Sequence, residues 1–145
     1  MEMVKLESEE AVFQFLKRYD ASATRKISDR VQNLEEYSEK LFEYAENYVI
    51  YQEGETAGFF SFYNNDIIEK RAYLTLIAIE TRYQGMKLGS CAIDFICEKC
   101  RKNQMNRLCL EVDKKNTSAC RFYRKKGFQM TGDASVDSFY MEKEV

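Results

Sequence analysis

The chain has 145 residues, and its 24 acidic and 22 basic side chains leave a formal net charge of −2. This balance supplies no broad basic field and argues against binding to nucleic acid. The absence of histidine removes histidine bases and histidine metal ligands, and we expect no metal site. No apolar run approaches the ~20 residues of a membrane helix. The five cysteines follow no secretory signal, so we expect a cytoplasmic protein with reduced thiols that binds no membrane.

The first third of the chain predicts two amphipathic helices. Residues 8–19 carry apolar side chains at helical spacing. Asn33, followed three positions later by Glu36, predicts a capping box for a second helix that runs to about residue 45. Both helices have one apolar stripe, so each is expected to pack one face against a core.

Three strand-like runs follow these helices. Residues 48–52 and 56–63 meet across a three-residue connection that contains Gly54, which predicts a hairpin. A second turn at 64–66 leads to the run 71–79, which is almost continuously apolar. Such a run predicts a central strand that is covered on both faces.

The second half of the chain alternates helices and strands. A glycine-bearing turn precedes a helix that reaches about Lys102, and a strand, a helix and two strands are expected over 107–112, 116–126, 128–130 and 138–142. This order predicts an α/β layered domain with a mixed sheet. Because no proline and no linker divides the chain, we expect a single domain over residues 1–145.

The turn before the third helix, residues 82–90, favours an anion. The first N–H groups of a helix lack intrahelical acceptors, and the helix dipole attracts negative charge there. Gly85 and Gly89 allow the backbone to approach a phosphate, and Arg82 and Lys87 supply positive charge. An ordinary strand-to-helix connection with two glycines is the alternative interpretation.

A second motif, downstream of this turn, makes a family resemblance visible. Asn116 and Ala119 are followed by Phe122-Tyr123 and by Gly127-Phe128. With the turn, these residues make the chain resemble the GNAT N-acetyltransferase superfamily over roughly residues 48–143. The resemblance implies a mixed, mostly antiparallel twisted sheet that is split between its central strands and flanked by about four helices.

The resemblance also implies acetyl-CoA as co-substrate. The family's pyrophosphate loop, Gln/Arg-x-x-Gly-x-Gly/Ala, falls on Gln84, Gly85, Met86, Lys87, Leu88 and Gly89, with Ser90 after it. Lys87 replaces the family's middle glycine, which leaves the geometry of the turn as a question. The backbone groups of Ile77, Ala78 and Ile79, beside a bulged strand, are expected to contact the pantetheine arm, and Asn116 the pantetheine or the acceptor.

Two residues are expected to carry proton transfer. Tyr123 matches the residue that protonates the departing CoA sulfur in many relatives, and a phenol is still protonated at neutral pH. Glu111, twelve positions earlier, matches the general base proposed for relatives that acetylate ribosomal N-termini. A purely packing role for Tyr123 and a surface role for Glu111 remain open, and Tyr73, Asp66 and Asp113 are weaker candidates for the base.

The expected activity is transfer of an acetyl group to the primary amine of a small molecule, such as an amino sugar or an amino acid derivative. Direct attack within a ternary complex needs no covalent acyl-enzyme. Two alternatives are a protein N-terminal or lysine acetyltransferase and a non-catalytic acyl-CoA-binding module. The oligomeric state is open, a homodimer included. The residues expected to line the acceptor site are Arg30, Tyr37, Asn64 and Tyr73.

Overall fold

A computed structural model describes residues 1–21 and 26–145. Its helices and strands are, in chain order, β1 (Glu2–Lys5), α1 (Glu9–Asp20), the 3-10 helix η1 (Ile27–Asp29), α2 (Leu34–Tyr44), β2 (Glu46–Gln52), β3 (Glu55–Asp66), β4 (Arg71–Ile79), the 3-10 helix η2 (Thr81–Tyr83), α3 (Leu88–Lys102), β5 (Arg107–Asp113), α4 (Thr117–Lys125), β6 (Gln129–Asp133) and β7 (Ser138–Glu144). The strands of the described residues pair in the order β1-β2-β3-β4-β5-β7-β6. The sheet is mixed: β1 with β2, β5 with β7 and β6 with β7 pair antiparallel, whereas β4 pairs parallel with β5.

The chain divides into two compact units. Unit 1 comprises residues 1–61 and 76–86, and unit 2 comprises residues 62–75 and 87–145. Strands β3 and β4 each begin in one unit and end in the other, so each unit holds part of both strands.

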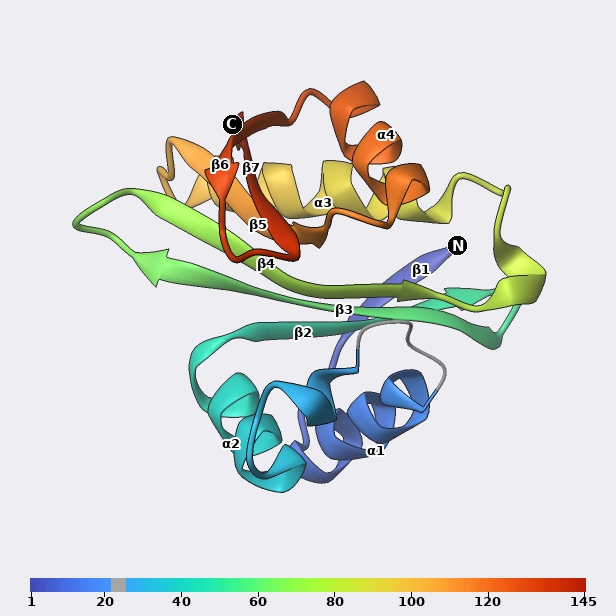
Figure 1. The fold of residues 1–145 in the computed structure, drawn as a ribbon. Helices are drawn as coiled ribbons and strands as arrows, with labels where there is room; N and C mark the ends of the chain where they lie inside the picture. Colours follow the sequence, from blue (N-terminus) through green and yellow to red (C-terminus); the bar gives the residue numbers. More distant parts are fainter. Residues whose placement is uncertain (22–25) are drawn as a thin grey trace. The chain divides into compact units, whose positions relative to one another are not determined.

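Unit 1 packs α1 and α2 next to β2 (Figure 1). Ser8 and Asn33 cap the two helices, because their side chains accept hydrogen bonds from the N–H groups of Ala11 (3.2 Å) and Glu36 (3.1 Å). The ring of Phe15 stacks on that of Phe59 with centroids 5.6 Å apart. The fully buried side chains of this core include Val12, Leu16, Leu41, Val49, Ile50 and Phe59.

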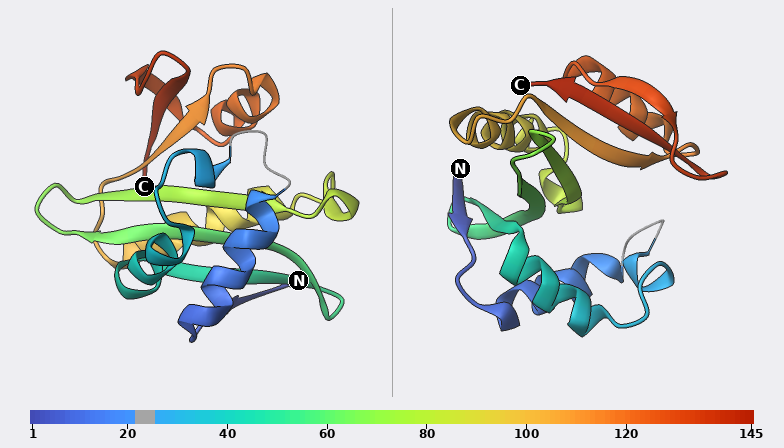
Figure 2. Two further views of the ribbon diagram at one scale, coloured as in Figure 1. Left: turned by 60° about the horizontal axis from the view of Figure 1, so that its bottom comes forward. Right: turned by 90° about the vertical axis from the view of Figure 1, so that its left-hand side faces the viewer.

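Unit 2 places α3 and α4 on one face of the β5–β7 ribbon, as both views in Figure 2 show. Strand β5 pairs antiparallel with β7 along its whole length, from Arg107 opposite Glu144 to Asp113 opposite Ser138. Strand β6 follows β7 at the end of the strand order, and a bulge shifts its register between Met130 and Gly132. The buried side chains beneath the helices include Ile93, Ile96, Leu108, Leu110 and Phe128.

The parallel ladder between β4 and β5 is short. It joins residues 71–74 to residues 107–110 and then stops, although β4 continues to Ile79 and β5 to Asp113. This is the predicted split between the central strands, and the predicted fold class is confirmed.

Several predicted boundaries were wrong for physical reasons. The run 71–79 is not covered on both faces, since residues 75–79 are only half-buried beyond the end of the β4–β5 ladder. The turn predicted at 64–66 belongs to β3, and the chain reverses at residues 67–70 instead. Strand β1 was not predicted, because four residues are too few to show a clear alternation of polar and apolar side chains. None of the helices in the described ranges is long and apolar enough to cross a membrane.

Candidate active site

In unit 1, the segment from β4 to Met86 is ordered by backbone geometry. Gly85 has a φ of +87°, and a Cβ there would meet no atom within 4 Å, so the glycine is explained by the left-handed backbone alone. The side chain of Gln84 donates to the carbonyl oxygen of Ile79 at 3.2 Å. Arg82, expected to meet a phosphate, forms an ion pair with Glu55 at 2.8 Å.

Gly58, also in unit 1, allows β3 to lie close to β4, and the sequence analysis did not predict this role. A Cβ on Gly58 would lie 2.6 Å from the carbonyl oxygen of Ala78. Since real Cβ atoms do not approach a carbonyl oxygen so closely, only glycine fits this position. Ile77, Ala78 and Ile79, predicted to meet the pantetheine arm, are half-buried in β4.

In unit 2, the backbone of Lys87 shows the geometry of the turn in which this lysine replaces the family's middle glycine. Its φ of +63° and ψ of +19° are left-handed, so the lysine adopts a conformation that is easiest for glycine. The first helical hydrogen bond of α3 runs from Cys91 N to Lys87 O at 3.0 Å. The N–H groups of residues 88–90 therefore precede the helical ladder and have no acceptor within α3.

The first turn of α3 carries additional positive charge from α4. The ammonium of Lys126, at the end of α4, donates to the Ser90 hydroxyl at 2.9 Å and to the Asp94 carboxylate at 2.7 Å. An anion bound at residues 88–90 would thus meet the positive end of the helix dipole and a nearby ammonium. These groups fit an anion such as a phosphate.

Asn116 has a clear structural role. Its side-chain oxygen accepts a hydrogen bond from Ala119 N at 3.1 Å and so caps α4. Its contact with pantetheine or acceptor stays a prediction.

Tyr123 is buried on α4 among aromatic rings. Its ring contacts those of Phe122 and Phe128 edge-on, with centroids 5.3 and 5.5 Å away. Burial, and secondarily the charge of Cys120, raises the pKa of the Tyr123 phenol to about 12. Within the described ranges its hydroxyl has no hydrogen bond, so a protonated donor is available for a ligand.

Glu111 lies on the face of β5 opposite to the buried Leu110, directly across from Tyr140 on β7. One of its carboxylate oxygens, Oε1, accepts a hydrogen bond of 2.6 Å from the hydroxyl of Ser138. Ser138 is fully buried and was not predicted from the sequence. Its partner could be found only from the β5–β7 register.

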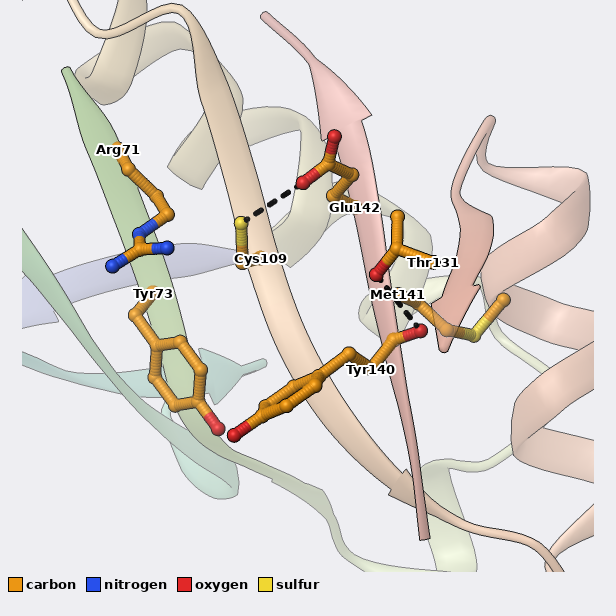
Figure 3. A pocket seen from close by; sticks show the side chains of 7 residues that line it. All are labelled: Arg71, Tyr73, Cys109, Thr131, Tyr140, Met141 and Glu142. Atoms are coloured by element: carbon orange, nitrogen blue, oxygen red, sulfur yellow. Dashed lines mark hydrogen bonds between the residues drawn. The ribbon is translucent and has the colours of Figure 1, made fainter. Parts of the chain in front are cut away.

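The same face of unit 2 contains a cavity with a volume of about 220 Å³ (Figure 3). Tyr73, Cys109 and Glu142 form one row across three strands, since Cys109 is the register partner of both others. Figure 3 shows the hydroxyls of Tyr73 and Tyr140 directed toward each other at one side of the cavity. The lining residues are Arg71, Tyr73, Cys109, Thr131, Tyr140, Met141 and Glu142.

Cys109 is a poor nucleophile in this cavity. Burial, with a further contribution from the charge of Glu142, raises the pKa of its thiol to about 11. The thiol instead donates to a carboxylate oxygen of Glu142 at 3.7 Å. A covalent acyl-enzyme at this position is therefore disfavoured.

The residues predicted to bind the acceptor do not all lie in one unit. Tyr73 lines the cavity and lies on β4, the strand next to β5, which carries Glu111. Asn64 also belongs to unit 2, but its amide donates to the carbonyl of Lys99 at the end of α3. Arg30 and Tyr37 belong to unit 1, and their role stays a prediction.

Comparison with known proteins identifies the family. The model of the Acetyltransferase (GNAT) family matches residues 9–128. A candidate ribosomal protein bS18-alanine N-acetyltransferase of Bacillus subtilis (strain 168) is 35% identical over 89 residues, which are 61% of this chain and 57% of the relative's length. This chain therefore spans little more than half of that curated relative.

Solved structures share the fold at lower identity. The ribosomal-protein-S18-alanine N-acetyltransferase of Escherichia coli superposes with a TM-score of 0.76 at 18% identity, covering 99% of this chain and 93% of that one. The PaiA N-acetyltransferase of Thermoplasma acidophilum, solved with coenzyme A, gives 0.74 at 18% identity and covers all of both chains. Because the family model extends over more than half of the sequence, this chain belongs to the GNAT acetyltransferase family.

Proposed function

We propose that the protein is an acetyl-CoA-dependent N-acetyltransferase in which a primary amine attacks the thioester directly. The observation that carries the proposal is the start of α3, where N–H groups without helical acceptors follow the left-handed Lys87. These N–H groups and the positive end of the helix dipole favour an anion such as a diphosphate, and the ammonium of Lys126, which is paired with Asp94, contacts Ser90 in the same turn. Gln84, Gly85 and Met86 come directly before these residues in the chain, and their contact with the cofactor is part of the same proposal.

Acetyl-CoA supplies the activated acetyl group, and the chain supplies the proton transfers. Glu111 takes a proton from the acceptor's ammonium, so that an N–H bond breaks, an O–H bond forms and the amine gains its lone pair. The amine nitrogen then forms a C–N bond to the acetyl carbon while the C–S bond of the thioester breaks, and the nitrogen releases its second proton to solvent. Tyr123 gives its phenol proton to the departing thiolate and recovers one from solvent. A phenol with a pKa of about 12 is protonated throughout the physiological range, as this role requires.

For the acceptor, we propose the α-amine of a polypeptide N-terminus rather than the small amine expected from the sequence. The support is the 35% identity to a relative named for ribosomal protein alanine acetylation. The cavity is compatible with it, because the row of Tyr73 and Cys109 lies two residues along the strands from Glu111, or about 6–7 Å. An extended peptide with its amine at Glu111 would therefore place its next residues over the cavity.

A small amine is the second candidate, and the size of the cavity favours it. A volume of about 220 Å³ holds one group the size of an amino acid side chain and not a long segment of peptide. Such an acceptor would use the same Glu111 and Tyr123.

The test is a screen of the purified protein for release of coenzyme A. One arm contains peptides that begin with alanine, serine or methionine, and the other contains amino sugars, polyamines and amino acid derivatives. We expect saturable release with peptides, with mass spectrometry locating the acetyl group on the α-amine. Release with small amines alone would select the second candidate.

Glu111→Gln is the matched variant for this screen, because it keeps the shape of the side chain and cannot accept the proton. We expect turnover to fall by about a hundredfold. Calorimetric binding of acetyl-CoA without any transfer would leave only a non-catalytic acyl-CoA-binding module. No binding at all would overturn the proposal.

A further inference from the structure

Two serines connect the candidate base to the surface of unit 2. Ser138, the first residue of β7, donates to Glu111 Oε1 at 2.6 Å, and its hydroxyl oxygen lies 2.8 Å from that of Ser135. Ser138 is completely buried, whereas Ser135 is exposed in the turn between β6 and β7. The three side chains form one hydrogen-bonded row.

The turn that carries these serines is tied to its surroundings. Ala134 N donates to Ser138 O at 2.9 Å, and Asp137 N donates to the Ser135 hydroxyl at 3.2 Å. Lys114 N, just after β5, donates to Asp137 O at 2.8 Å. Backbone hydrogen bonds to Ser138 itself and to its neighbour Asp137 therefore fix the position of Ser138 relative to Glu111.

Packing alone does not explain a serine at position 138. A buried hydroxyl is costly unless it is paired, and alanine would fill nearly the same volume without that cost. The distance of 2.6 Å is typical of a hydroxyl that donates to an ionised carboxylate. The pairing thus fixes the orientation of the Glu111 carboxylate.

We infer that Ser138, supported by Ser135, is a positioning residue for Glu111, and this inference rests on the proposed function. The Ser138 hydroxyl holds Oε1 and thereby fixes the orientation of the carboxylate that takes the proton of the acceptor ammonium. In that step an N–H bond of the ammonium breaks and an O–H bond forms on the carboxylate.

The test measures the steady-state kinetics of Ser138→Ala, Ser138→Thr and Ser135→Ala. In Ser138→Ala we expect kcat to fall about tenfold, because the carboxylate is no longer held in one orientation. Ser138→Thr keeps the hydroxyl and should restore kcat. Ser135→Ala should lower kcat by less, and the KM for acetyl-CoA should be unchanged in all three.

Ser38→Ala is the matched control, since Ser38 is also buried and donates to the carbonyl of Glu35 at 2.7 Å in α2. It should lower stability and leave kcat unchanged. In a Glu111→Gln background, Ser138→Ala should cause no further loss of turnover. An unchanged kcat in Ser138→Ala, or additive losses in the double variant, would overturn the inference even if acetyl transfer itself is demonstrated.

Discussion

The two units differ in the kind of group that each would offer to a ligand. In unit 1 the predicted contacts come from the backbone, at residues 77–79 of β4 and at the left-handed Gly85. In unit 2 the proton-transfer groups are side chains, Glu111 on β5 and Tyr123 on α4, in addition to the backbone N–H groups of residues 88–90. A side-chain role can be removed by a conservative substitution, whereas a backbone role can be disturbed only by steric or conformational changes. The following predictions use this difference.

The largest effect is expected from a steric change in unit 1. Gly58→Val places a Cβ 2.6 Å from Ala78 O, which cannot move unless β4 moves with it. We expect a loss of about 3 kcal/mol in the free energy of unfolding, measured in urea. The control is Gly54→Ala, whose Cβ meets no atom within 4 Å, so only the strain of its positive φ, about 1 kcal/mol, should appear. Equal losses in the two variants would contradict the steric explanation.

The second prediction concerns unit 2 at alkaline pH. The pKa of Tyr123 is about 12 when folded and about 10 in an unfolded chain, so the folded protein holds this proton more tightly. Its contribution to stability is complete below pH 10 and is lost as the pH rises to 12. The loss should be about 2 to 3 kcal/mol.

Alkaline unfolding curves of the wild type and of Tyr123→Phe would measure this contribution. The dependence between pH 10 and 12 should be weaker in the variant and not abolished, because the pKa of Tyr48 is also raised to about 12. Identical curves would show that the phenol is not held in a desolvated site.

The third prediction separates the acid from the packing of α4. Tyr123→Phe should lower turnover at least tenfold and leave the affinity for acetyl-CoA nearly intact, because only the proton donor is removed. Phe122→Leu changes the neighbouring ring without removing a donor and should lower stability more than turnover. Unchanged turnover in Tyr123→Phe would exclude the acid role.

The smallest effect is expected at Lys87. Lys87→Gly relieves the left-handed backbone and should raise stability by up to about 1 kcal/mol, while the lost charge raises the KM for acetyl-CoA. Lys87→Ala loses the same charge and keeps the strain. Gln104→Gly, at another position with a φ of +62°, should raise stability with no change in KM. A KM that stays constant in both Lys87 variants would remove the lysine from the phosphate contacts.

Sequence reasoning succeeded where structure is local. The cap at Asn33 depends on residues three or four apart, and the family motifs around Gly85 and Tyr123 lie on continuous stretches of chain. These features need no knowledge of which strands are neighbours. The fold class and most of the helices could therefore be predicted from the sequence.

The remaining features depend on strand register, which the sequence does not state. Ser138 meets Glu111 only because β5 and β7 pair with Asp113 opposite Ser138. Gly58 looks like any strand glycine until β3 is placed against Ala78. The cavity combines residues of four strands, and Arg71, Thr131 and Glu142 have no shared motif. Tyr73 was predicted at the acceptor site, but from its type and not from its neighbours.

The bulge in β6 has a consequence for the behaviour of the protein at high concentration. A regular edge strand would present an unbroken row of backbone N–H and C=O groups, and a strand of a second copy of the chain could pair with it. The register shift between Met130 and Gly132 interrupts that row. Concentrated samples should consequently resist polymerisation through pairing of β6 edges. Deletion of Thr131, which would make β6 regular, should promote this polymerisation.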